Sequence, residues 1–295
     1  MEEKYTFRVR LADEWKRGWF LFSRNKLTLV GLGIVILVLL LAIFAPVLTP
    51  YASHADVFVD YAAANQAPSF AHPCGTDPFG RDILTRILFS LRGALEMAFV
   101  VLAVSVPFGV MLGLIAGYMR GTVVDTVIMR ITDIFLSVPP ILLALAIAAV
   151  LEANLRNTML AVTVMWWPWY CRVTYSMASS LRSENYVIAA ELMGAGRAHI
   201  LFREILPSCL SPVFTKMALD VGWVILIGAT LSYVGLGAQG NTPALGQMLS
   251  DGVSYMPEYW WMTIYPSAAI AIIILGFNLF GDGLRDALSK GDMQK

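Results

Sequence analysis

The stretch from Leu27 to Leu48, LTLVGLGIVILVLLLAIFAPVL, contains no charged residue. A helix needs about 20 apolar residues to cross roughly 30 Å of hydrocarbon, because every backbone amide in lipid must bond within its own segment. Seven basic residues precede this stretch, which is longer than the apolar core of about 7–15 residues in a cleavable signal. We therefore expect a permanent transmembrane helix that ends near the helix-breaking Pro46 and Pro50.

The composition of the whole chain agrees with a membrane protein. Of its 295 residues, 58% are hydrophobic and 14% charged, against about 45–50% and 25% in soluble domains. The formal net charge is zero, which gives no electrostatic reason to expect nucleic-acid binding. Cys74, Cys171 and Cys209 are too few and too scattered for a disulfide framework or a metal-binding pair, so we expect them to be structural.

The pattern predicts an all-α integral membrane fold with about six transmembrane helices. The predicted spans are 27–48, 93–118, 123–152, 158–178, 212–237 and 263–283, and each boundary is placed to within about 2–4 residues. The third span begins with a half-polar stretch that holds Asp125 and Asp133, and it contains Pro139-Pro140. The fourth is interrupted by Trp167-Pro168-Trp169. We expect each of these two spans to be kinked or partly outside the lipid.

Lysine and arginine placement predicts the orientation, because short cytoplasmic loops carry an excess of positive charge. With the amino terminus inside, 17 of the 21 basic residues fall on the cytoplasmic side. Both termini are therefore expected in the cytoplasm. The predicted organisation is a cytoplasmic segment 1–26, the first helix 27–48, an extracytoplasmic loop 49–92, a five-helix core 93–283 with a cytoplasmic loop 179–211, and a cytoplasmic tail 284–295.

The cytoplasmic loop contains ENYVIAAELMGAGR at 184–197. This stretch predicts a short helix that is capped by Ser183 or Asn185 and ends at Gly194. A second short helix, from about Arg197 to Ile205, is expected to stop at Leu206-Pro207. The two helices would form a compact hairpin on the cytoplasmic side.

Small and apolar side chains of the hairpin predict a docking surface. The small residues, which let a partner approach the helix backbone, are Ala189, Ala190, Gly194 and Ala195. The apolar anchors, suited to a groove on a partner, are Tyr186, Val187 and Leu192. A hairpin that only packs beneath its own bundle explains the same residues equally well, so both interpretations stay open.

Three charged residues in the spans need an explanation, because a charge in a span is costly and is by default a functional hypothesis. Asp220 follows Lys216 by four positions, which is the spacing of an ion pair on one helix face. Because the Lys216–Asp220 pair is expected near the inner membrane surface, a structural role is favoured over a functional one. Glu96 lies near the outer end of the second span, where it faces a water-filled path or snorkels to the interface.

The segment Ile188-Ala189-Ala190, followed by Gly194 and by Ile205-Leu206-Pro207, resembles the EAA loop of ABC importer permeases. The resemblance implies that this helix inserts into a cleft of a cytoplasmic ATPase subunit and transmits its motion. The implied ATPase-coupling residues are Tyr186, Val187, Ala189, Ala190, Glu191, Gly194 and Ala195. Ile188 departs from the family pattern, which often has an acidic residue at this position.

Three further stretches resemble one branch of that family, the second (C-type) permease of dipeptide, oligopeptide and nickel importers. They are HPCGTDPFGRD at 72–82, LGA at 236–238 leading to TPALGQML at 242–249, and FNLFGDGLRD at 277–286. Leu245 stands where the family pattern has tryptophan. The four pieces occur in the expected order and cover the chain from about residue 20 to 288.

The resemblance implies a transport subunit of the prokaryotic inner membrane that forms half of a translocation path for peptides, with nickel, metal chelates or other small solutes as the alternative. The implied partners are a homologous second permease, two ATPase subunits and an extracytoplasmic solute-binding protein. No phosphate-binding loop of the pattern GxxxxGK[ST] occurs in the sequence. ATP and Mg²⁺ are therefore expected on the ATPase subunits, and neither a cofactor nor a metal on this chain.

Two other classes fit the residues less well. An intramembrane serine protease needs a histidine within reach of its nucleophile, whereas His54, His72 and His199 all fall in predicted loops. A secondary transporter that works alone would carry several ionisable residues near the membrane centre and usually an internal repeat. The central turns of the six predicted spans have few such residues.

Overall fold

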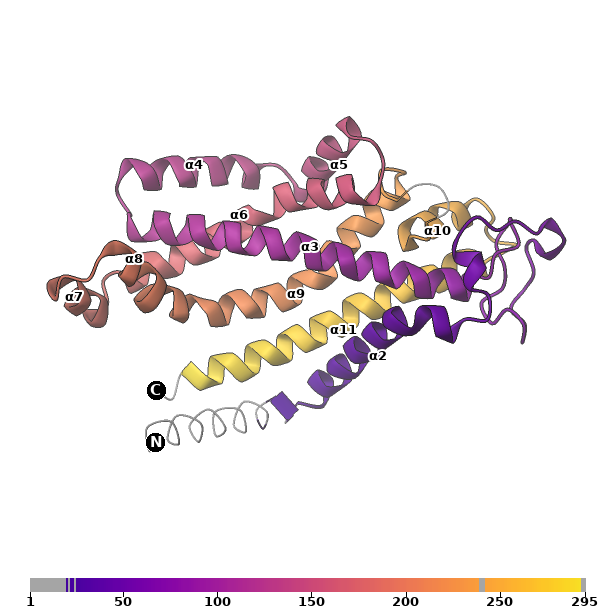
Figure 1. The fold of residues 1–295 in the computed structure, drawn as a ribbon, viewed down its shortest axis with the longest axis horizontal. Coiled ribbons are helices and arrows are strands. Elements are labelled where there is room, and N and C mark those ends of the chain that lie inside the picture. The colour runs from indigo at the N-terminus through magenta and orange to yellow at the C-terminus, as the bar shows by residue number, and fades with distance from the viewer. Residues whose placement is uncertain (1–19, 21, 24, 239–241, 293–295) are drawn as a thin grey trace.

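The computed structural model describes residues 20, 22–23, 25–238 and 242–292. The fold is all-α, as predicted (Figure 1). The α-helices are α2 Lys26–Leu48, α3 Ile83–Tyr118, α4 Val123–Ser137, α5 Pro140–Val150, α6 Leu155–Leu181, α7 Asn185–Leu192, α8 Arg197–His199, α9 Leu206–Tyr233, α10 Leu245–Val253 and α11 Trp261–Asp292. Two short 3₁₀ helices, η1 Ala52–Ala55 and η2 Tyr61–Ala63, and a π-helical segment, η3 Ile200–Ile205, complete the structure.

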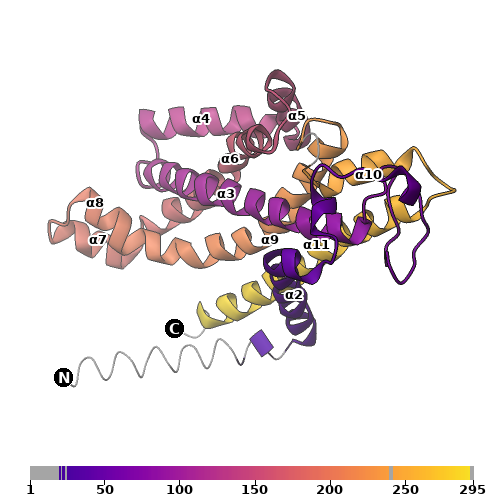
Figure 2. The ribbon, with the colours of Figure 1, turned by 45° about the vertical axis from the view of Figure 1, so that its right-hand side comes forward.

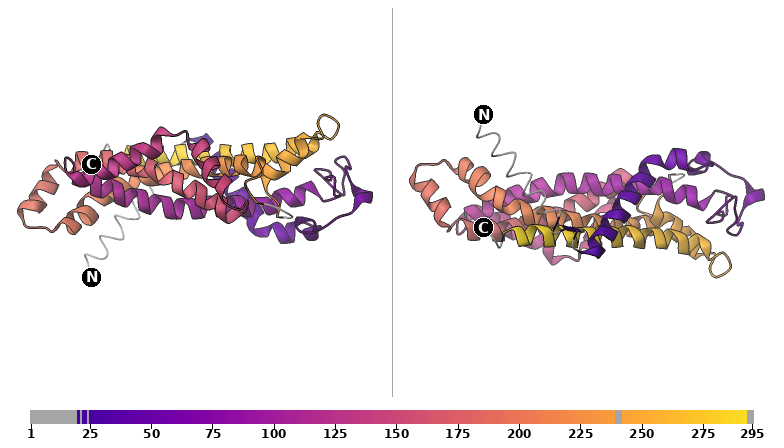
Figure 3. Two further views of the ribbon diagram at one scale, coloured as in Figure 1. Left: turned by 90° about the horizontal axis from the view of Figure 1, so that it is seen from above. Right: turned by 90° about the horizontal axis from the view of Figure 1, so that it is seen from below.

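The long helices run side by side along the longest axis of the molecule (Figures 1 and 3). At one end α7 and α8 project beyond the bundle, and we call this the α7 end. At the opposite end lie the segment 49–82 and α10, and we call this the loop end. The parts of the chain that were expected on opposite sides of a membrane thus lie at opposite ends of the bundle.

Four helices in the described part of the chain are long and apolar enough to cross a membrane, namely Lys26–Leu48, Ile83–Tyr118, Arg197–Tyr233 and Trp261–Ala287. They correspond to the first, second, fifth and sixth predicted spans. The third predicted span is the pair α4 and α5, which together make a fifth candidate that is bent by 89°. The fourth corresponds to α6, whose 27 residues fall outside the helices that pass this test and pack extensively on α3.

Prolines act differently in the two irregular spans. The chain bends between α4 and α5 at Val138-Pro139, and Pro140 opens α5 at a position where its missing N–H costs nothing. This bend confirms the expected kink. The helix α6, in contrast, continues through Pro168 from Leu155 to Leu181, so Trp167-Pro168-Trp169 does not divide it into two helices.

The predicted stop at Leu206-Pro207 was wrong. The segments α8, η3 and α9 form one continuous helix, Arg197–Tyr233. Just before Pro207 the chain adopts a π-helical turn, in which the amide of Leu206 donates to the carbonyl of Leu201. Such a widened turn accommodates a residue that has no N–H and would clash with the carbonyl four positions earlier.

A glycine stripe on α3 lets α3 and α6 approach closely. Gly109, Gly113 and Gly117 recur every four residues, so they lie on one face of the helix. A Cβ on Gly113 would lie 2.4 Å from the carbonyl oxygen of Cys171, and one on Gly109 would lie 2.4 Å from that of Trp167. Small residues at this spacing are typical of close helix packing in membranes.

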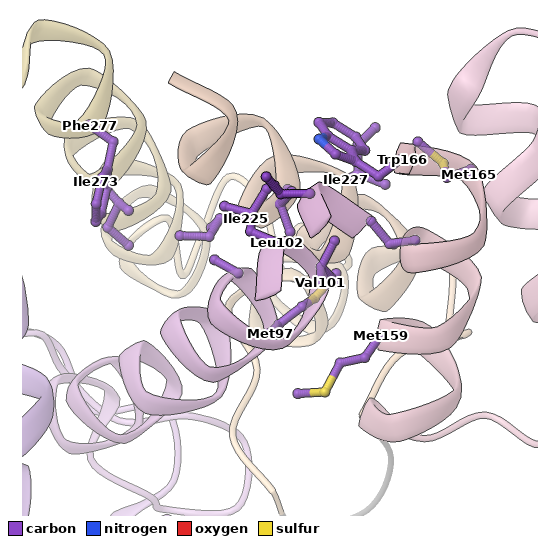
Figure 4. Packing of buried hydrophobic residues seen from close by; sticks show 14 of the residues in the cluster. Met97, Val101, Leu102, Met159, Met165, Trp166, Ile225, Ile227, Ile273 and Phe277 are labelled. Carbon is purple, nitrogen blue, oxygen red and sulfur yellow. The ribbon is translucent and has the colours of Figure 1, made fainter. Parts of the chain in front are cut away.

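One apolar core joins α3, α6, α9 and α11 within the bundle (Figure 4). Its labelled members are Met97, Val101 and Leu102 of α3, Met159, Met165 and Trp166 of α6, Ile225 and Ile227 of α9, and Ile273 and Phe277 of α11. The first helix, α2, packs mainly on α11, as the turned view in Figure 2 shows. Most of the predicted segment 1–26 lies outside the described residues, and α11 extends to Asp292, so the predicted tail is largely helical.

Candidate functional site

The short helix α7 begins and ends through backbone geometry. Its N-cap is Glu184, whose side chain makes no capping hydrogen bond, so neither Ser183 nor Asn185 is the cap that we predicted. At the other end Gly194 adopts a φ of 84°, its amide donates to Glu191, and the amide of Ala195 donates to Ala190. This pair of bonds is a Schellman motif, which requires a left-handed residue and therefore favours glycine. The predicted end at Gly194 is confirmed.

The inner face of α7 packs on its own chain. Val187 is fully buried and Ala190 is 6% exposed. Val187 belongs to the same apolar cluster as Ile200 and Ile205 of η3, and α7 contacts that segment. Because residues three apart share one helix face, Val187 and Ala190 turn inward together. Both side chains are covered by their own chain, and their role as docking residues stays a prediction.

The outward face of α7 is apolar and exposed. We call Tyr186, Ile188, Ala189, Leu192 and Met193 the α7 ridge, because all five are exposed. Leu192 and Met193 are 84% and 82% exposed. Adjacent large apolar side chains with so much free surface are unusual on a protein that has no partner. The ridge therefore has the chemistry of an interaction surface.

A hydrogen bond ties α7 to the end of α3. The hydroxyl of Tyr118 donates to Oε1 of Glu191 over 2.9 Å, and the guanidinium of Arg182 lies 5.7 Å from the centre of the Tyr118 ring. Nearby, Arg120 of the α3–α4 turn donates to the hydroxyl of Ser179 on α6. Glu191, one of the implied coupling residues, is exposed and has in Tyr118 an internal partner that the sequence did not reveal.

Lys216 and Asp220 form the predicted ion pair on α9. The ammonium of Lys216 lies 3.0 Å from the Asp220 carboxylate, and the indole N–H of Trp166 donates to Oδ2 of Asp220 over 2.9 Å. Asp220 is 4% exposed. Lys216 also lies 5.3 Å from the Tyr170 ring centre and 5.8 Å from that of Trp169. These contacts between α6 and α9 support the structural interpretation of the pair.

Glu96 lies apart from that pair. It is exposed on α3 and lines a groove of about 980 Å³ whose other walls come from α2, α9 and α11. Arg92 is the other charged residue of this groove. Among the residues that the structure places, none forms a hydrogen bond or ion pair with the Glu96 carboxylate. A second ion pair, between Arg172 of α6 and Asp133 of α4, was not predicted.

At the loop end, Asp77 organises the turn before α3. Its Oδ1 accepts from the amides of Phe79 and Arg81, and its Oδ2 accepts from Nε of Arg81 over 2.6 Å. Gly80, with a φ of 75°, completes this turn. Asp82 then caps α3 by accepting from the amide of Thr85. The motif that carried part of the family resemblance is therefore a folded turn and helix cap.

Two histidines pack beside this cap. Nδ1 of His54 accepts from the backbone amide of Asp82 over 3.0 Å, and the His54 ring stacks on Phe58. Nδ1 of His72 lies 3.0 Å from the Asp82 carboxylate. Burial is the largest influence on His54 and lowers its pKa below the usual 6.5, against the opposite effect of Asp82. Burial also raises the pKa of Cys74 to about 11, so its thiol stays protonated at neutral pH.

In the described ranges, no three His, Cys, Asp or Glu side chains are grouped so that they could hold a metal ion. Comparison with known proteins gives two matches along the chain. Residues 109–291 match the binding-protein-dependent transport system inner membrane component. Residues 14–68 match the N-terminal transmembrane domain of oligopeptide transport permease C. The chain belongs to the binding-protein-dependent transport permeases. This inner-membrane permease is thus a multi-pass transport component that is not itself catalytic.

Similar proteins of known name match almost the whole permease. It is 41% identical over 287 residues to the dipeptide transport system permease protein DppC of Alkalihalophilus pseudofirmus, covering 97% of this chain and 92% of the relative. It is 38% identical to the glutathione transport system permease protein GsiD of Pectobacterium atrosepticum, covering 93% and 90%. It is 35% identical to the oligopeptide transport system permease protein OppC of Bacillus subtilis, covering 93% and 88%.

The family resemblance is confirmed, and membership of a binding-protein-dependent family implies partner subunits. The matched region 109–291 includes α7 and the Lys216–Asp220 pair, whereas Glu96 lies outside both matched regions.

Proposed function

We propose that this permease forms half of the translocation path of an ATP-driven importer of short peptides. The named relatives transport dipeptides, oligopeptides or glutathione, which supports a peptide cargo. The observation that carries the coupling mechanism is the exposed apolar α7 ridge. A homologous permease completes the path, two cytoplasmic ATPase subunits bind ATP and Mg²⁺, and a solute-binding protein docks at the loop end.

The ridge suits an ATPase cleft for a physical reason. An amphipathic helix that lays apolar anchors into a groove gains affinity from the surface that it removes from water. Leu192 and Met193 supply those anchors, and exposed Ala189 lets the groove wall approach the helix. The inner face of α7 stays packed on η3, so a force on the ridge passes into the helix that continues as α9.

Motion reaches the bundle by two routes in this proposal. One runs through η3 into α9, and the other runs through the Tyr118–Glu191 hydrogen bond into α3. ATP binding closes the ATPase pair, and its different contacts with α7 in the two states shift the bundle between inward-open and outward-open arrangements. This orientation places the α7 end and both termini in the cytoplasm, in agreement with the positions of the basic residues.

The substitution Leu192→Arg tests the coupling proposal. Leu192 is 84% exposed, so the change leaves the fold of the permease intact but puts a charge into the proposed apolar groove. We expect at least a tenfold loss of ATPase co-purification and of ATP hydrolysis stimulated by the binding protein. Val57→Arg, at a residue that is 75% exposed at the opposite end, is the matched control and should retain ATPase co-purification.

The result that would contradict the proposal is normal assembly and normal stimulated hydrolysis in Leu192→Arg. A substitution at Ala190 is less informative, because that side chain is buried against the chain itself. Arginine at position 190 would disturb the packing of α7 whether or not an ATPase docks there.

A further inference from the structure

A polar cavity of about 440 Å³ lies at the loop end, between the turn that precedes α3 and the helix α10. Asp77, Arg81 and Arg86 line one wall. Ser250, Asp251 and Tyr255 line the other. The volume falls within the range of about 300–1,000 Å³ that is usual for small-molecule sites. Its charged lining distinguishes it from the apolar groove beside Glu96.

Arg86 is a buried cation whose charge is only partly compensated. It is 4% exposed. One of its terminal nitrogens donates a long hydrogen bond of 3.4 Å to the carbonyl of His54, and its Nε lies 3.9 Å from Asp77. That carboxylate already binds Nε of Arg81 at 2.6 Å and accepts from two backbone amides. A buried charge without a close partner is costly, so an incoming anion would gain free energy beside Arg86.

Asp251 offers the opposite charge on the other wall. It is exposed, and its carboxylate accepts a hydrogen bond from the neutral amide of Gln247. In the described ranges, no lysine, arginine or histidine nitrogen lies within 4.0 Å of Asp251. Arg86, which Asp77 compensates only in part, and Asp251, which has no close basic partner in the described ranges, therefore line one cavity with opposite charges.

We propose that this cavity binds a short zwitterionic peptide as it enters the translocation path. Arg86 receives the terminal carboxylate, because a guanidinium binds a carboxylate through two parallel hydrogen bonds. Asp251 receives the terminal ammonium group. Arg86 also lies in the first turn of α3, where the helix dipole favours an anion. The proposal rests on the function proposed above and adds a peptide site on the permease itself.

The test uses the complete transporter in lipid nanodiscs without its binding protein. The probes are L-alanyl-L-alanine, its C-terminal amide, which lacks the carboxylate, and its N-acetyl derivative, which lacks the ammonium group. Saturation-transfer NMR detects binding, and titration of each probe into the nanodiscs gives its affinity. We expect the unmodified dipeptide to bind wild type roughly tenfold more tightly than either derivative, which is the effect of about 1.4 kcal/mol.

Two substitutions separate the two charges. Arg86→Gln should abolish the preference over the amide and keep the preference over the N-acetyl derivative. Asp251→Asn should do the reverse, and Glu258→Gln, a change at an exposed acid in the turn that follows α10, should do neither. If burial makes Arg86→Gln unstable, Arg86→Lys keeps the charge but loses the paired hydrogen bonds, and it should reduce the preference over the amide.

Three results would overturn the proposal. The first is a wild type that shows no binding of the dipeptide or no preference. The second is a set of variants that all keep both preferences. The third is an Arg86→Gln variant that loses affinity for the binding protein while its peptide preferences stay unchanged, since Arg86 would then receive a side chain of that protein. Failure of the proposed function is separate: wild type with binding protein and ATP would then import no dipeptide into proteoliposomes.

Discussion

Asp220 illustrates how a single residue can be charged inside an apolar bundle. Its carboxylate has an ammonium partner in Lys216 and an indole N–H donor in Trp166. Removing one partner of a buried pair generally costs about 3–5 kcal/mol, because the other charge is left behind. The sequence spacing predicted the pair on α9, but Trp166 lies 54 positions away. Only the packing of α6 on α9 brings this donor to the carboxylate.

His54 gives a pH prediction at the residue scale. Its folded pKa lies below 6.5 because of burial, while Asp82, Asp77 and Asp60 raise it and His72 lowers it. Between the folded pKa and 6.5 the unfolded chain binds more protons, so the free energy of unfolding rises with pH in that window. We expect the segment 49–82 to loosen as the pH falls below about 6.5, because protonated Nδ1 cannot accept from the Asp82 amide.

Hydrogen–deuterium exchange at pH 5.5 and 7.5, corrected for intrinsic exchange rates, measures this loosening, with α6 as the internal reference. His54→Gln should reduce the pH dependence of segment 49–82. His72→Gln leaves His54 in place and should retain that dependence. Equal protection of segment 49–82 at both pH values in wild type would contradict the role given to His54.

At the scale of elements, the contact between α3 and α6 depends on the glycine stripe. Gly113→Ala would place a Cβ 2.4 Å from the carbonyl oxygen of Cys171. The helices must then separate, and we expect a destabilisation of about 1–3 kcal/mol. Thermal unfolding in detergent measures the change.

Gly33→Ala on α2 is the matched control, because nothing lies within 4 Å of its added Cβ. This variant should be neutral or slightly more stable, since alanine favours the helix over glycine. If the two variants had the same melting temperature, close approach of α3 and α6 would not need the stripe.

The elements that the sequence predicted best are those with strong local signals. The uninterrupted apolar run gave α2, whereas α3 begins at Ile83, ten residues before the predicted span 93–118. The predicted helix stop failed at Pro207, where a π-helical turn accommodates the proline, and α6 continues as one helix through Pro168. Proline removes one hydrogen bond, whereas the burial of a long apolar helix removes much more surface from water.

At the scale of the whole molecule, we expect the α7 end of the bundle to face the cytoplasm and the loop end to face the outside. Leu192→Cys places a thiol at the α7 end, at a residue that is 84% exposed, and Phe70→Cys places one at the loop end, at a fully exposed residue. In intact cells we expect a membrane-impermeant maleimide to label position 70 and to label position 192 only after permeabilisation. Background labelling should be low, because Cys171 and Cys209 are buried and the pKa of Cys74 is raised to about 11.

Labelling of Leu192→Cys from outside would exclude α7 as the site where an ATPase acts. The same outcome would also reverse the orientation that the basic residues predict. The wild-type protein, treated in parallel, gives the contribution of the native cysteines.

The sequence by itself determined that this chain is an all-helical membrane permease, because apolar runs, basic-residue placement and short family motifs are local properties. It also located α7 and its glycine end. The tertiary structure decided which side chains are available, since burial depends on what packs against each helix face. Val187 and Ala190 turn inward while Leu192 and Met193 turn outward. It also decided that Arg86 and Asp251, 165 positions apart in sequence numbering, line one cavity.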